Sequence, residues 1–385
     1  MLHIILVGAV GMGALLLFVV LPVNFVCTPR LSRGRARAAR TPRVSVVIPA
    51  RDEERCIERA VMSHLSQVYS DLEIIAVNDR SSDRTGEILA ALARGDSRLT
   101  VVTGSEPPAG WLGKPHALHL GASVATGEVL LFADADVVYE PRTLGEAVSL
   151  LESERLDFIA FLPRMATEGF WESVLMPYVL GAYFAGIGFL ANVDWPRWAA
   201  AGGGAGNLIR RDAYEALGGH AALRDSVVDD VHLALRAKRA GFRTRAVRAE
   251  DRVSVRMYRG LFEVVNGFTK NIGYALQGLL GAVLFVLTAV ITLFWVVPPL
   301  ALAAALLGAP VAKQDVLIEA AGLALVVAAR LAAAAALGDK LWPAVTHPIM
   351  AAIWGFIICR SLYHRIVRRR LVWRGREFDA RAARF

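Results

Sequence analysis

The fold is decided by the stretch Val44-Ser-Val-Val-Ile-Pro-Ala-Arg-Asp-Glu53, a β-branched, apolar run that reaches a proline and is followed by two acids. Such a run favours a buried strand. Residues 52–66 then carry apolar side chains at Ile57, Val61 and Leu65, the spacing of an amphipathic helix. The first unit of the fold is therefore predicted to be a strand, a loop and a helix.

The same unit recurs further along the chain. Residues 72–77 form the next expected strand and residues 85–93 the next helix, with a polar turn between them. Further strands are expected at residues 99–102 and 129–133. This alternation predicts an α/β fold with a parallel, doubly wound sheet and helices on both faces. Ligands of such sheets lie beyond the carboxyl ends of the strands.

Hydrophobic residues make up 55% of the 385-residue chain, more than soluble proteins carry. The excess lies in an N-terminal and a C-terminal region, and the residues between them have the composition of a soluble domain. The three cysteines are widely separated, so neither a disulfide framework nor a zinc site is expected. We expect four parts: an N-terminal transmembrane anchor at 1–28, a soluble domain at 40–270, a C-terminal transmembrane region at 275–364 and a basic cytosolic tail at 365–385.

The first 27 residues lack the charged start and small-residue cleavage site of a signal peptide, so an uncleaved anchor is favoured over that alternative. A run of arginines follows, at Arg30, Arg33, Arg35, Arg37, Arg40 and Arg43. The positive-inside rule places this run and the soluble domain in the cytosol, in an integral protein of the plasma membrane. The charge of +8 also permits nucleic-acid binding, but no aromatic residues interleave with the arginines. Anionic lipid headgroups are the simpler partner, and no nucleic acid is expected.

Three apolar blocks occupy the C-terminal region, at residues 275–308, 316–337 and 341–362. A span needs about 20 residues, so the first block is too long for one span and three or four spans are expected. The arginines of the tail predict that the tail is cytosolic, like the soluble domain, so the number of spans between them should be even, which favours four.

Two polar motifs follow the first two strands. The first is Pro49-Ala-Arg-Asp-Glu53 and the second is Asn78-Asp-Arg-Ser-Ser-Asp83. Each is consistent with a turn that caps the next helix, and each also places acids where they would accept hydrogen bonds from a nucleobase or ribose.

A third motif, Asp134-Ala-Asp136, follows an apolar strand. Side chains alternate along an extended segment, so the two carboxylates lie on the same side and repel each other unless a cation sits between them. Magnesium prefers oxygen ligands and is commonly held by few carboxylates plus substrate phosphates. Metal binding is therefore favoured over an exposed acidic loop.

A fourth motif, Asp229-Asp230, precedes a helical pattern, where helix capping is the rival interpretation. The glycine run at residues 201–206 lacks the Gly-x-Gly-x-x-Gly spacing of a dinucleotide site. It is consistent with a tight turn, and the resemblance given next implies the alternative, a wall of the acceptor and sugar pocket. His220, further on, is expected to be structural rather than catalytic.

In this order the motifs resemble those of the family-2 glycosyltransferases, over residues 44–270. The matching segments are Val44 to Glu53, Val77-Asn-Asp-Arg-Ser-Ser-Asp83, Gly113-Lys-Pro-His-Ala-Leu118, Asp134-Ala-Asp136 and Asp229-Asp-Val-His-Leu233. The resemblance implies the nucleotide-sugar-binding fold called GT-A, with a Rossmann-like mixed sheet. It also implies inverting transfer by in-line displacement, with a divalent metal, Mg²⁺ or Mn²⁺, and a nucleoside-diphosphate sugar as donor.

Site residues carried over by position fall into four groups. The resemblance implies nucleotide-sugar binding by Pro49, Ala50, Glu53, Asp79, Lys114 and Asp134, metal binding by Asp134 and Asp136, base catalysis by Asp230, and an acceptor or diphosphate side at Gly204, His220, Arg256 and Arg259. Glutamate is commoner where this chain has Asp229, which leaves the base open between Asp229 and Asp230.

The acceptor is expected to be a lipid or a terpenoid. The Gln-x-x-Arg-Trp motif of processive synthases is missing after Asp230, so transfer of a single sugar is expected. Aromatic and apolar residues near 169–195 predict helices lying on the bilayer, against the alternative of a buried helix pair. The ending Trp373-Arg-Gly-Arg-Glu-Phe378 is similar to that of family members associated with carotenoid glycosylation. A polyprenyl-phosphate glycosyltransferase is the alternative, and a non-enzymatic membrane scaffold is a third interpretation.

Overall fold

The computed structural model describes residues 7–8, 11, 15–31, 41–275, 300, 302–308, 313–364, 370–373 and 376–379. These residues form two compact units. One unit contains residues 27–166 and 187–257 and is built around a sheet; the other contains residues 1–26, 167–186 and 258–385 and is largely helical. The arginines at 33–40, most of the first C-terminal apolar block and most of the basic tail lie outside the described residues.

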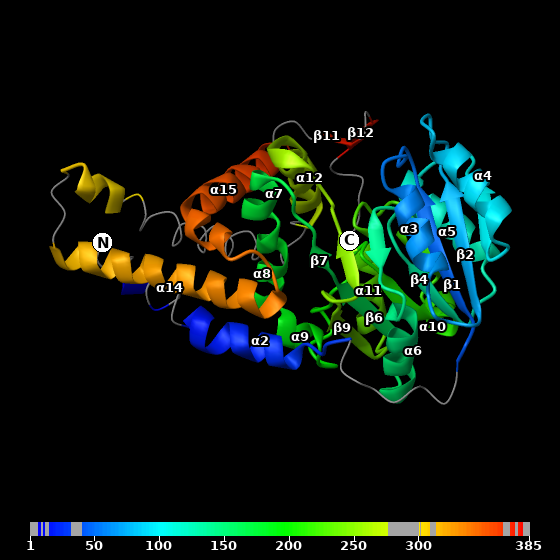
Figure 1. The fold of residues 1–385 in the computed structure, drawn as a ribbon, viewed down its shortest axis with the longest axis horizontal. Coiled ribbons are helices and arrows are strands. Elements are labelled where there is room, and N and C mark those ends of the chain that lie inside the picture. The colour runs from blue at the N-terminus through cyan, green and yellow to red at the C-terminus, as the bar shows by residue number, and fades with distance from the viewer. Residues whose placement is uncertain are drawn as a thin grey trace. The chain divides into compact units, whose positions relative to one another are not determined.

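The sheet unit is an α/β fold, as the alternation of patterns predicts (Figure 1). Its seven-stranded sheet has the order β3-β2-β1-β4-β8-β6-β9. These strands are β1 (Val44–Ala50), β2 (Leu72–Asn78), β3 (Leu99–Thr103), β4 (Val129–Phe132), β6 (Phe158–Leu162), β8 (Asn207–Arg210) and β9 (Thr244–Arg248). The helices are α3 (Ile57–Leu65), α4 (Thr85–Gly95), α5 (Gly113–Val124), α6 (Thr143–Ser153), α9 (Gly188–Ala191), α10 (Arg211–Ala216), the 3₁₀ helix η2 (Gly219–Leu223) and α11 (Asp229–Arg239).

One strand runs against the others. The strands β3, β2, β1 and β4 are parallel, but β8 pairs antiparallel with both β4 and β6. The sheet is therefore mixed, as the resemblance implies, whereas the parallel sheet expected from the alternation alone extends only as far as β4. The physical reason is that strand–helix alternation constrains direction only as far as β4, while β8 follows a long stretch without that pattern.

The sheet core is apolar on both faces of the central strands. One face packs against α5, α10 and α11 through side chains such as Val47, Val77 and Leu130, none of which is exposed. The helices α3 and α4 contact β2, and α3 also packs on α4. Burial of this kind favours the fold by about 1.5–3 kcal/mol per large apolar side chain.

A small second sheet flanks the carboxyl end of β4. It has the order β5-β10-β7, with β5 (Val137–Tyr139), β10 (Val253–Val255) and β7 (Arg164–Met165). Val255 pairs with Val137, so β10 ends beside the residue that directly follows Asp136.

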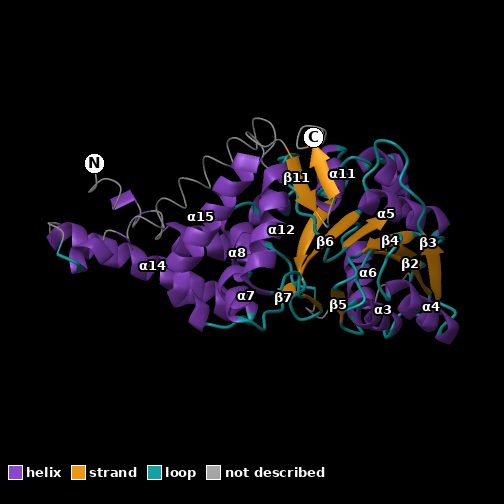
Figure 2. Cartoon of the chain, turned by 90° about the horizontal axis from the view of Figure 1, so that it is seen from above, coloured by secondary structure: helices purple, strands orange, loops and turns teal. Residues whose placement is uncertain are grey.

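The helical unit contains the long helices of the C-terminal region. Its elements are the π-helical turn η1 (Leu16–Val20), α2 (Leu21–Cys27), α7 (Phe170–Leu175), α8 (Pro177–Ala185), α12 (Gly260–Ala275), α14 (Lys313–Leu337), the 3₁₀ helix η3 (Trp342–Thr346), α15 (His347–Tyr363) and the hairpin β11 (Arg370–Trp373) and β12 (Arg376–Asp379). Figure 2 shows how strongly helices dominate this unit.

Two helical stretches are long and apolar enough to cross a membrane, Gln314–Leu337 and Trp342–Tyr363. By itself this is weak evidence for a membrane, because length and composition are the whole test. The further spans expected in the first C-terminal block fall outside the described residues. The segment expected to lie on the bilayer forms the short helices α7, α8 and α9, of which α7 packs on α12 and α15 with Val174 and Leu175 fully buried.

Candidate active site

The carboxyl edge of the sheet gathers the predicted site residues because of three features of the topology. Parallel strands β1, β2 and β4 end at this edge, so the motifs after them meet there. The antiparallel β8 begins there, because Asn207 pairs with Phe132 at the end of β4. The helix α11 runs back along the sheet toward β9, so its first residue, Asp229, also lies at this edge.

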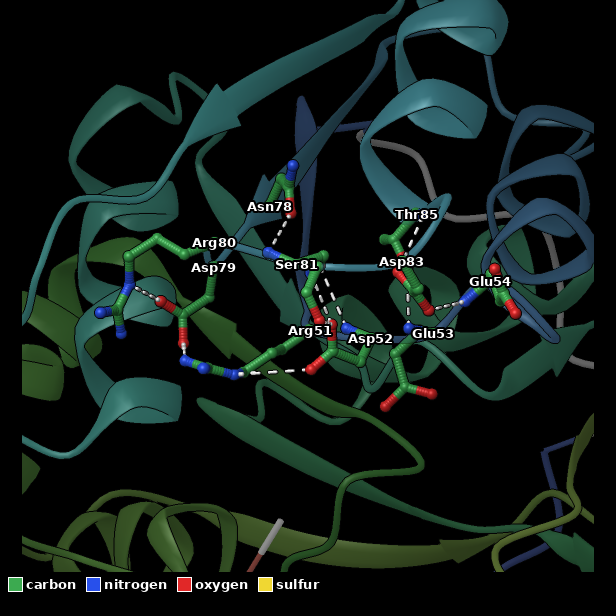
Figure 3. A network of polar contacts seen from close by, with 11 residues as sticks. Arg51, Asp52, Glu53, Glu54, Asn78, Asp79, Arg80, Ser81, Asp83 and Thr85 are labelled. Carbon is green, nitrogen blue, oxygen red and sulfur yellow. Dashed lines mark hydrogen bonds and ion pairs between the residues drawn. The ribbon is translucent and has the colours of Figure 1, made fainter. Parts of the chain in front are cut away.

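Asp79 is held in place by two arginines. Its carboxylate lies 3.1 Å from Nε of Arg80 and 3.5 Å from Nη1 of Arg51, and its backbone N–H donates to the carbonyl of Ala50 (Figure 3). The residue is only 5% exposed. A carboxylate has about four lone-pair sites, so Asp79 can still accept from a base or ribose after both arginine contacts.

Neighbouring acids in the same network serve local structure. Asp83 accepts from the N–H and hydroxyl of Thr85, at 3.0 and 2.6 Å, and from the N–H of Glu54 (Figure 3). These bonds organise the start of α4, so the capping interpretation holds for Asp83. The backbone N–H of Glu53 donates to Thr85, and its carboxylate accepts from Cys56 at 3.2 Å.

The metal motif lies against a lysine. Lys114 Nζ, at the start of α5, is 2.7 Å from Oδ1 of Asp134 and 3.9 Å from Oδ1 of Asp229. Burial alone would lower the pKa of Lys114, but the carboxylates of Asp134, Asp229 and Asp230 outweigh burial and hold the pKa well above its usual range. Lys114 therefore stays cationic and is the local counter-ion of the acids.

Asp136 shows the opposite shift. Burial, together with the charges of Asp134 and Glu53, raises the pKa of Asp136 to about 7. Converging carboxylates of this kind are stabilised by a divalent cation with oxygen ligands. Within the described ranges no group of three or more His, Cys, Asp or Glu side chains gathers as a metal site. Asp134 and Asp136 thus fit an ion that takes its remaining ligands from substrate phosphates and water.

The glycine run forms the wall behind Asp134. The N–H of Asp134 donates to the carbonyl of Gly204 at 2.8 Å, and a Cβ added to Gly204 would lie 2.0 Å from Oδ2 of Asp134. A Cβ at Gly202 would lie 2.3 Å from the carbonyl oxygen of Asp230. A side chain at Gly204 would therefore clash with the carboxylate of Asp134, and one at Gly202 with the backbone of α11, which favours the pocket-wall interpretation of this run over a simple turn.

The two acids of α11 have different environments. Asp229 is 2% exposed, and burial raises its pKa to about 7 against the opposing charge of Lys114. Asp230 is partly exposed, and its Oδ1 accepts from the N–H of Val231. Both acids lie in the first turn of the helix, so the dipole favours them as the capping interpretation requires.

His220 is enclosed by aromatic side chains. Its Nδ1 lies 2.9 Å from the hydroxyl of Tyr214, which also accepts from the His220 N–H, and its ring packs edge-on against Phe132. Burial lowers the pKa of His220 to about 3, so the ring is neutral at physiological pH. When Tyr214 donates to Nδ1, the ring proton is on Nε2, the atom 3.8 Å from Asp229. His220 is thus placed to orient Asp229.

The two predicted arginines belong to different units. Arg256 is in the sheet unit and follows β10 by one residue, beside the segment that contains Asp136. Arg259 is in the helical unit, where its N–H donates to Glu263. Arg256 therefore belongs to the unit that contains the site, and Arg259 belongs to the other unit.

Three residues that sequence reasoning did not single out also support the site. Asn207 donates to the carbonyl of Asp230 at 3.0 Å and accepts from the N–H of Gly203, which ties the glycine run to α11. Tyr139 donates to the carbonyl of Ala205 at 2.5 Å. Arg51 contacts Asp79, as described above. Asn207 could have been found in the sequence because it is a polar residue at the start of the otherwise apolar segment Asn207-Leu-Ile.

Comparison with known proteins finds glycosyltransferases. A 4,4'-diaponeurosporenoate glycosyltransferase from Staphylococcus haemolyticus is 27% identical over 241 residues, and the match covers 60% of this chain and 61% of the relative. The same-named protein of Staphylococcus aureus MRSA252 is 25% identical over 61% of this chain and 62% of its own length. The chain thus spans about three fifths of these relatives.

A solved structure shares the fold. It is described as the mannosyltransferase PcManGT from Pyrobaculum calidifontis in complex with GDP-Man and Mn²⁺, and it matches with a TM-score of 0.55 at 20% identity, over 96% of this chain and 99% of that one. The family model for glycosyl transferase family 2 matches residues 45–218, which contain the strands β1 to β8 and the acids Asp79, Asp134 and Asp136. Over residues 45–218 the chain is therefore similar to glycosyl transferase family 2.

Proposed function

We propose that this enzyme transfers a single sugar, with inversion, from a nucleoside-diphosphate sugar to an apolar lipid or terpenoid acceptor at the cytosolic face of the plasma membrane. The observation that carries the proposal is the convergence of Asp134, Asp136, Lys114 and Asp230 on one edge of the sheet. Nucleotide-sugar transfer needs a diphosphate subsite and a base, and this edge supplies both kinds of group.

The nucleoside would lie over the ends of β1 and β2. Pro49 and Ala50 end β1, and Asp79, fixed by Arg51 and Arg80, offers its free lone pairs to base or ribose donors. Glu53 lies close enough to influence the pKa of Asp136, so this subsite continues directly into the metal motif.

The diphosphate would lie at Lys114 and the metal motif. A divalent ion, when bound by Asp134 and Asp136, supplies positive charge that stabilises the departing nucleoside diphosphate. The Nζ of Lys114 lies 2.7 Å from Oδ1 of Asp134 and neutralises that carboxylate. The raised pKa of Lys114 keeps the side chain cationic, so it could also contact a phosphate oxygen. Gly204 leaves free the space that the Asp134 carboxylate occupies, because any Cβ at residue 204 would clash with Oδ2 of Asp134.

Asp230 is the proposed base. It is partly exposed at the start of α11, whereas Asp229 is buried beside Lys114 and His220. An acceptor hydroxyl would lose its proton to Asp230 while its oxygen forms the new bond to the anomeric carbon, and the bond to the diphosphate breaks on the opposite face. Asp229 then acts as a positioning residue for Lys114.

An apolar acceptor is supported by two features. The helical unit has two stretches able to cross a membrane, which would keep the enzyme where lipids are. The relatives named 4,4'-diaponeurosporenoate glycosyltransferases are named for a carotenoid acid, so a carotenoid-like acceptor is the first to test.

A phosphate acceptor on a polyprenyl chain is the second candidate, favoured by one observation. Arg256 follows the strand that pairs with Val137 and so lies next to the metal motif, where it would attract a second phosphate. A phosphate is already anionic and needs no base, so the two candidates differ in their dependence on Asp230.

The test uses membranes that contain the full chain, a panel of radiolabelled nucleotide sugars, Mn²⁺ or Mg²⁺, and either carotenoid acids and alcohols or polyprenyl phosphates. Label in the organic phase that disappears with Asp230→Asn supports the first candidate. Label that survives Asp230→Asn and appears with polyprenyl phosphate alone supports the second. Absence of any lipid-linked label, with nucleotide binding intact, would contradict both.

A further inference from the structure

The helical unit contains a pocket between α14, α8 and the turn η3 that begins α15. Helix α14 contacts α8 and η3, and the walls of the pocket come from these elements, from α15, from the segment between α14 and η3, and from Leu21 at the start of α2. Its lining is nearly all apolar, and many of the wall residues on α14 are small, including Ala329, Ala333 and Ala334. Small side chains leave space along the helix that larger ones would fill.

Gly181 contributes open space from the opposite wall. It lines the pocket from α8, and a Cβ added there would have no atom within 4 Å. The pocket can therefore accept the methylene groups of a chain, and a larger side chain at Gly181 would occupy the same volume.

Three charged residues interrupt the apolar walls: Arg330, Asp339 and Lys340. Arg330 lines the pocket and is the seventeenth of the 24 residues of the apolar stretch Gln314–Leu337, about 10 Å from its end at 1.5 Å per residue. Within the part of the chain that the structure describes, its Nη1 is buried without a hydrogen-bond partner. A charged group inside an apolar span is costly unless it meets a partner, so an anion is the missing complement.

The other basic group of the pocket is already engaged by the protein. Lys340 donates to the carbonyl of Thr167 at 2.8 Å and contacts the hydroxyl of Ser173 at 3.3 Å. His347, also in the wall, is 1% exposed and neighbours Arg330 along the pocket. Arg330 is thus the group that would meet an incoming anion.

We propose that this pocket binds a lipid with one long apolar chain and a single anionic end group, a carboxylate or a phosphate, and that Arg330 pairs with that end group. Apolar walls with several small residues, and a buried arginine nitrogen without a hydrogen-bond partner among the described residues, match such a molecule in shape and charge. The lipid belongs to the same chemical class as the acceptor proposed above, but its binding is measured without sugar transfer, so the two proposals fail separately.

The test is photo-crosslinking of the purified full chain in neutral detergent. Three probes carry the same diazirine-bearing long chain and end in a carboxylate, a phosphate or an alcohol. We expect the two anionic probes to label peptides within residues 326–350 and the alcohol to label them at least about tenfold less. Comparison of the two anionic probes then identifies the preferred end group.

Variants separate charge from space. Arg330→Gln should weaken both anionic probes about tenfold or more and leave the alcohol unchanged, while Arg330→Lys retains most of the labelling. Gly181→Leu should reduce all three probes. The matched control is Arg360→Gln, which removes an arginine of α15 that donates to Asn266 and, like Asn266, lies outside the pocket lining. Nucleoside-diphosphate binding and the thermal midpoint report folding.

Two results would overturn the proposal: equal labelling by the alcohol and the acids in the unmodified chain, or labelling of other segments only. If the Arg330 variants do not fold, the comparison of probes in the unmodified chain and in Gly181→Leu still decides.

Discussion

The close approach of Gly204 to Asp134 predicts how far kcat should fall when Gly204 is replaced by alanine. In Gly204→Ala the new methyl carbon would lie 2.0 Å from Oδ2 of Asp134, whereas an ordinary contact begins near 3.4 Å. The carboxylate must therefore retreat by about 1.4 Å, away from its contact with Lys114. Misplacement of a reacting group by about 1 Å costs roughly 10²-fold in rate, so kcat should fall about 100-fold.

The neighbouring Gly203 is the matched control, because a Cβ there would meet nothing within 4 Å. Initial rates of sugar transfer should be measured for both variants across a range of Mn²⁺ concentrations, with the thermal midpoint as the check on folding. We expect Gly203→Ala to keep its kcat, and Gly204→Ala to lose rate and to need more metal. A folded Gly204→Ala enzyme with unchanged kcat and metal dependence would refute the placement of Asp134.

Three further predictions test other parts of the sheet unit. Asp230→Asn should lower kcat by about 10²–10⁴ while nucleotide binding is kept, and Asp229→Asn should cost clearly less; equal losses in both variants would contradict the choice of base. His64 is fully buried, and burial lowers its pKa to about 3, so between pH 6.5 and 3 the unfolded chain takes up a proton that the folded chain refuses and stability is lost as pH falls. The free energy of unfolding should fall by about 2 kcal/mol between pH 7 and pH 5 for this reason, and His64→Phe should remove that part of the fall in denaturant unfolding at the two pH values; parallel pH dependences of the two proteins would argue against it. Lys238 is 2% exposed and donates to the carbonyls of Leu190 and Ala199, at 2.6 and 2.5 Å. Lys238→Met should therefore destabilise the sheet unit by about 2–3 kcal/mol, measured as a lower thermal midpoint. An unchanged thermal midpoint would show that these two hydrogen bonds contribute nothing to stability.

Periodicity was sufficient to predict the strands β1 to β4 and the edge at which their motifs meet. The pattern of apolar residues fixes which face of a strand is buried, and parallel pairing then brings Asp79 and Asp134 to the same edge. The direction of β8 was not predictable in this way, because Asn207–Arg210 has the same composition whichever way it runs. The reversal explains why the glycine run reaches Asp134.

The difference between Asp229 and Asp230 also needed coordinates. Successive residues of a helix are rotated by about 100°, so one of two adjacent acids turns inward and the other outward. Which one is buried depends on the phase of α11 against Lys114 and His220, and those residues come from distant parts of the chain. Likewise, composition alone does not reveal that residues 167–186 group with the C-terminal helices.

The position of β8 has a consequence for biosynthesis. In the finished sheet β8 separates β4 from β6, yet the ribosome makes it after both of them and after α7 and α8. Until residue 210 has emerged, β4 and β6 each present an unpaired apolar edge, which is the kind of surface that promotes aggregation. A nascent chain that pauses between residues 162 and 207 should therefore depend on chaperones, and rapid placement of α7 and α8 would shorten that period.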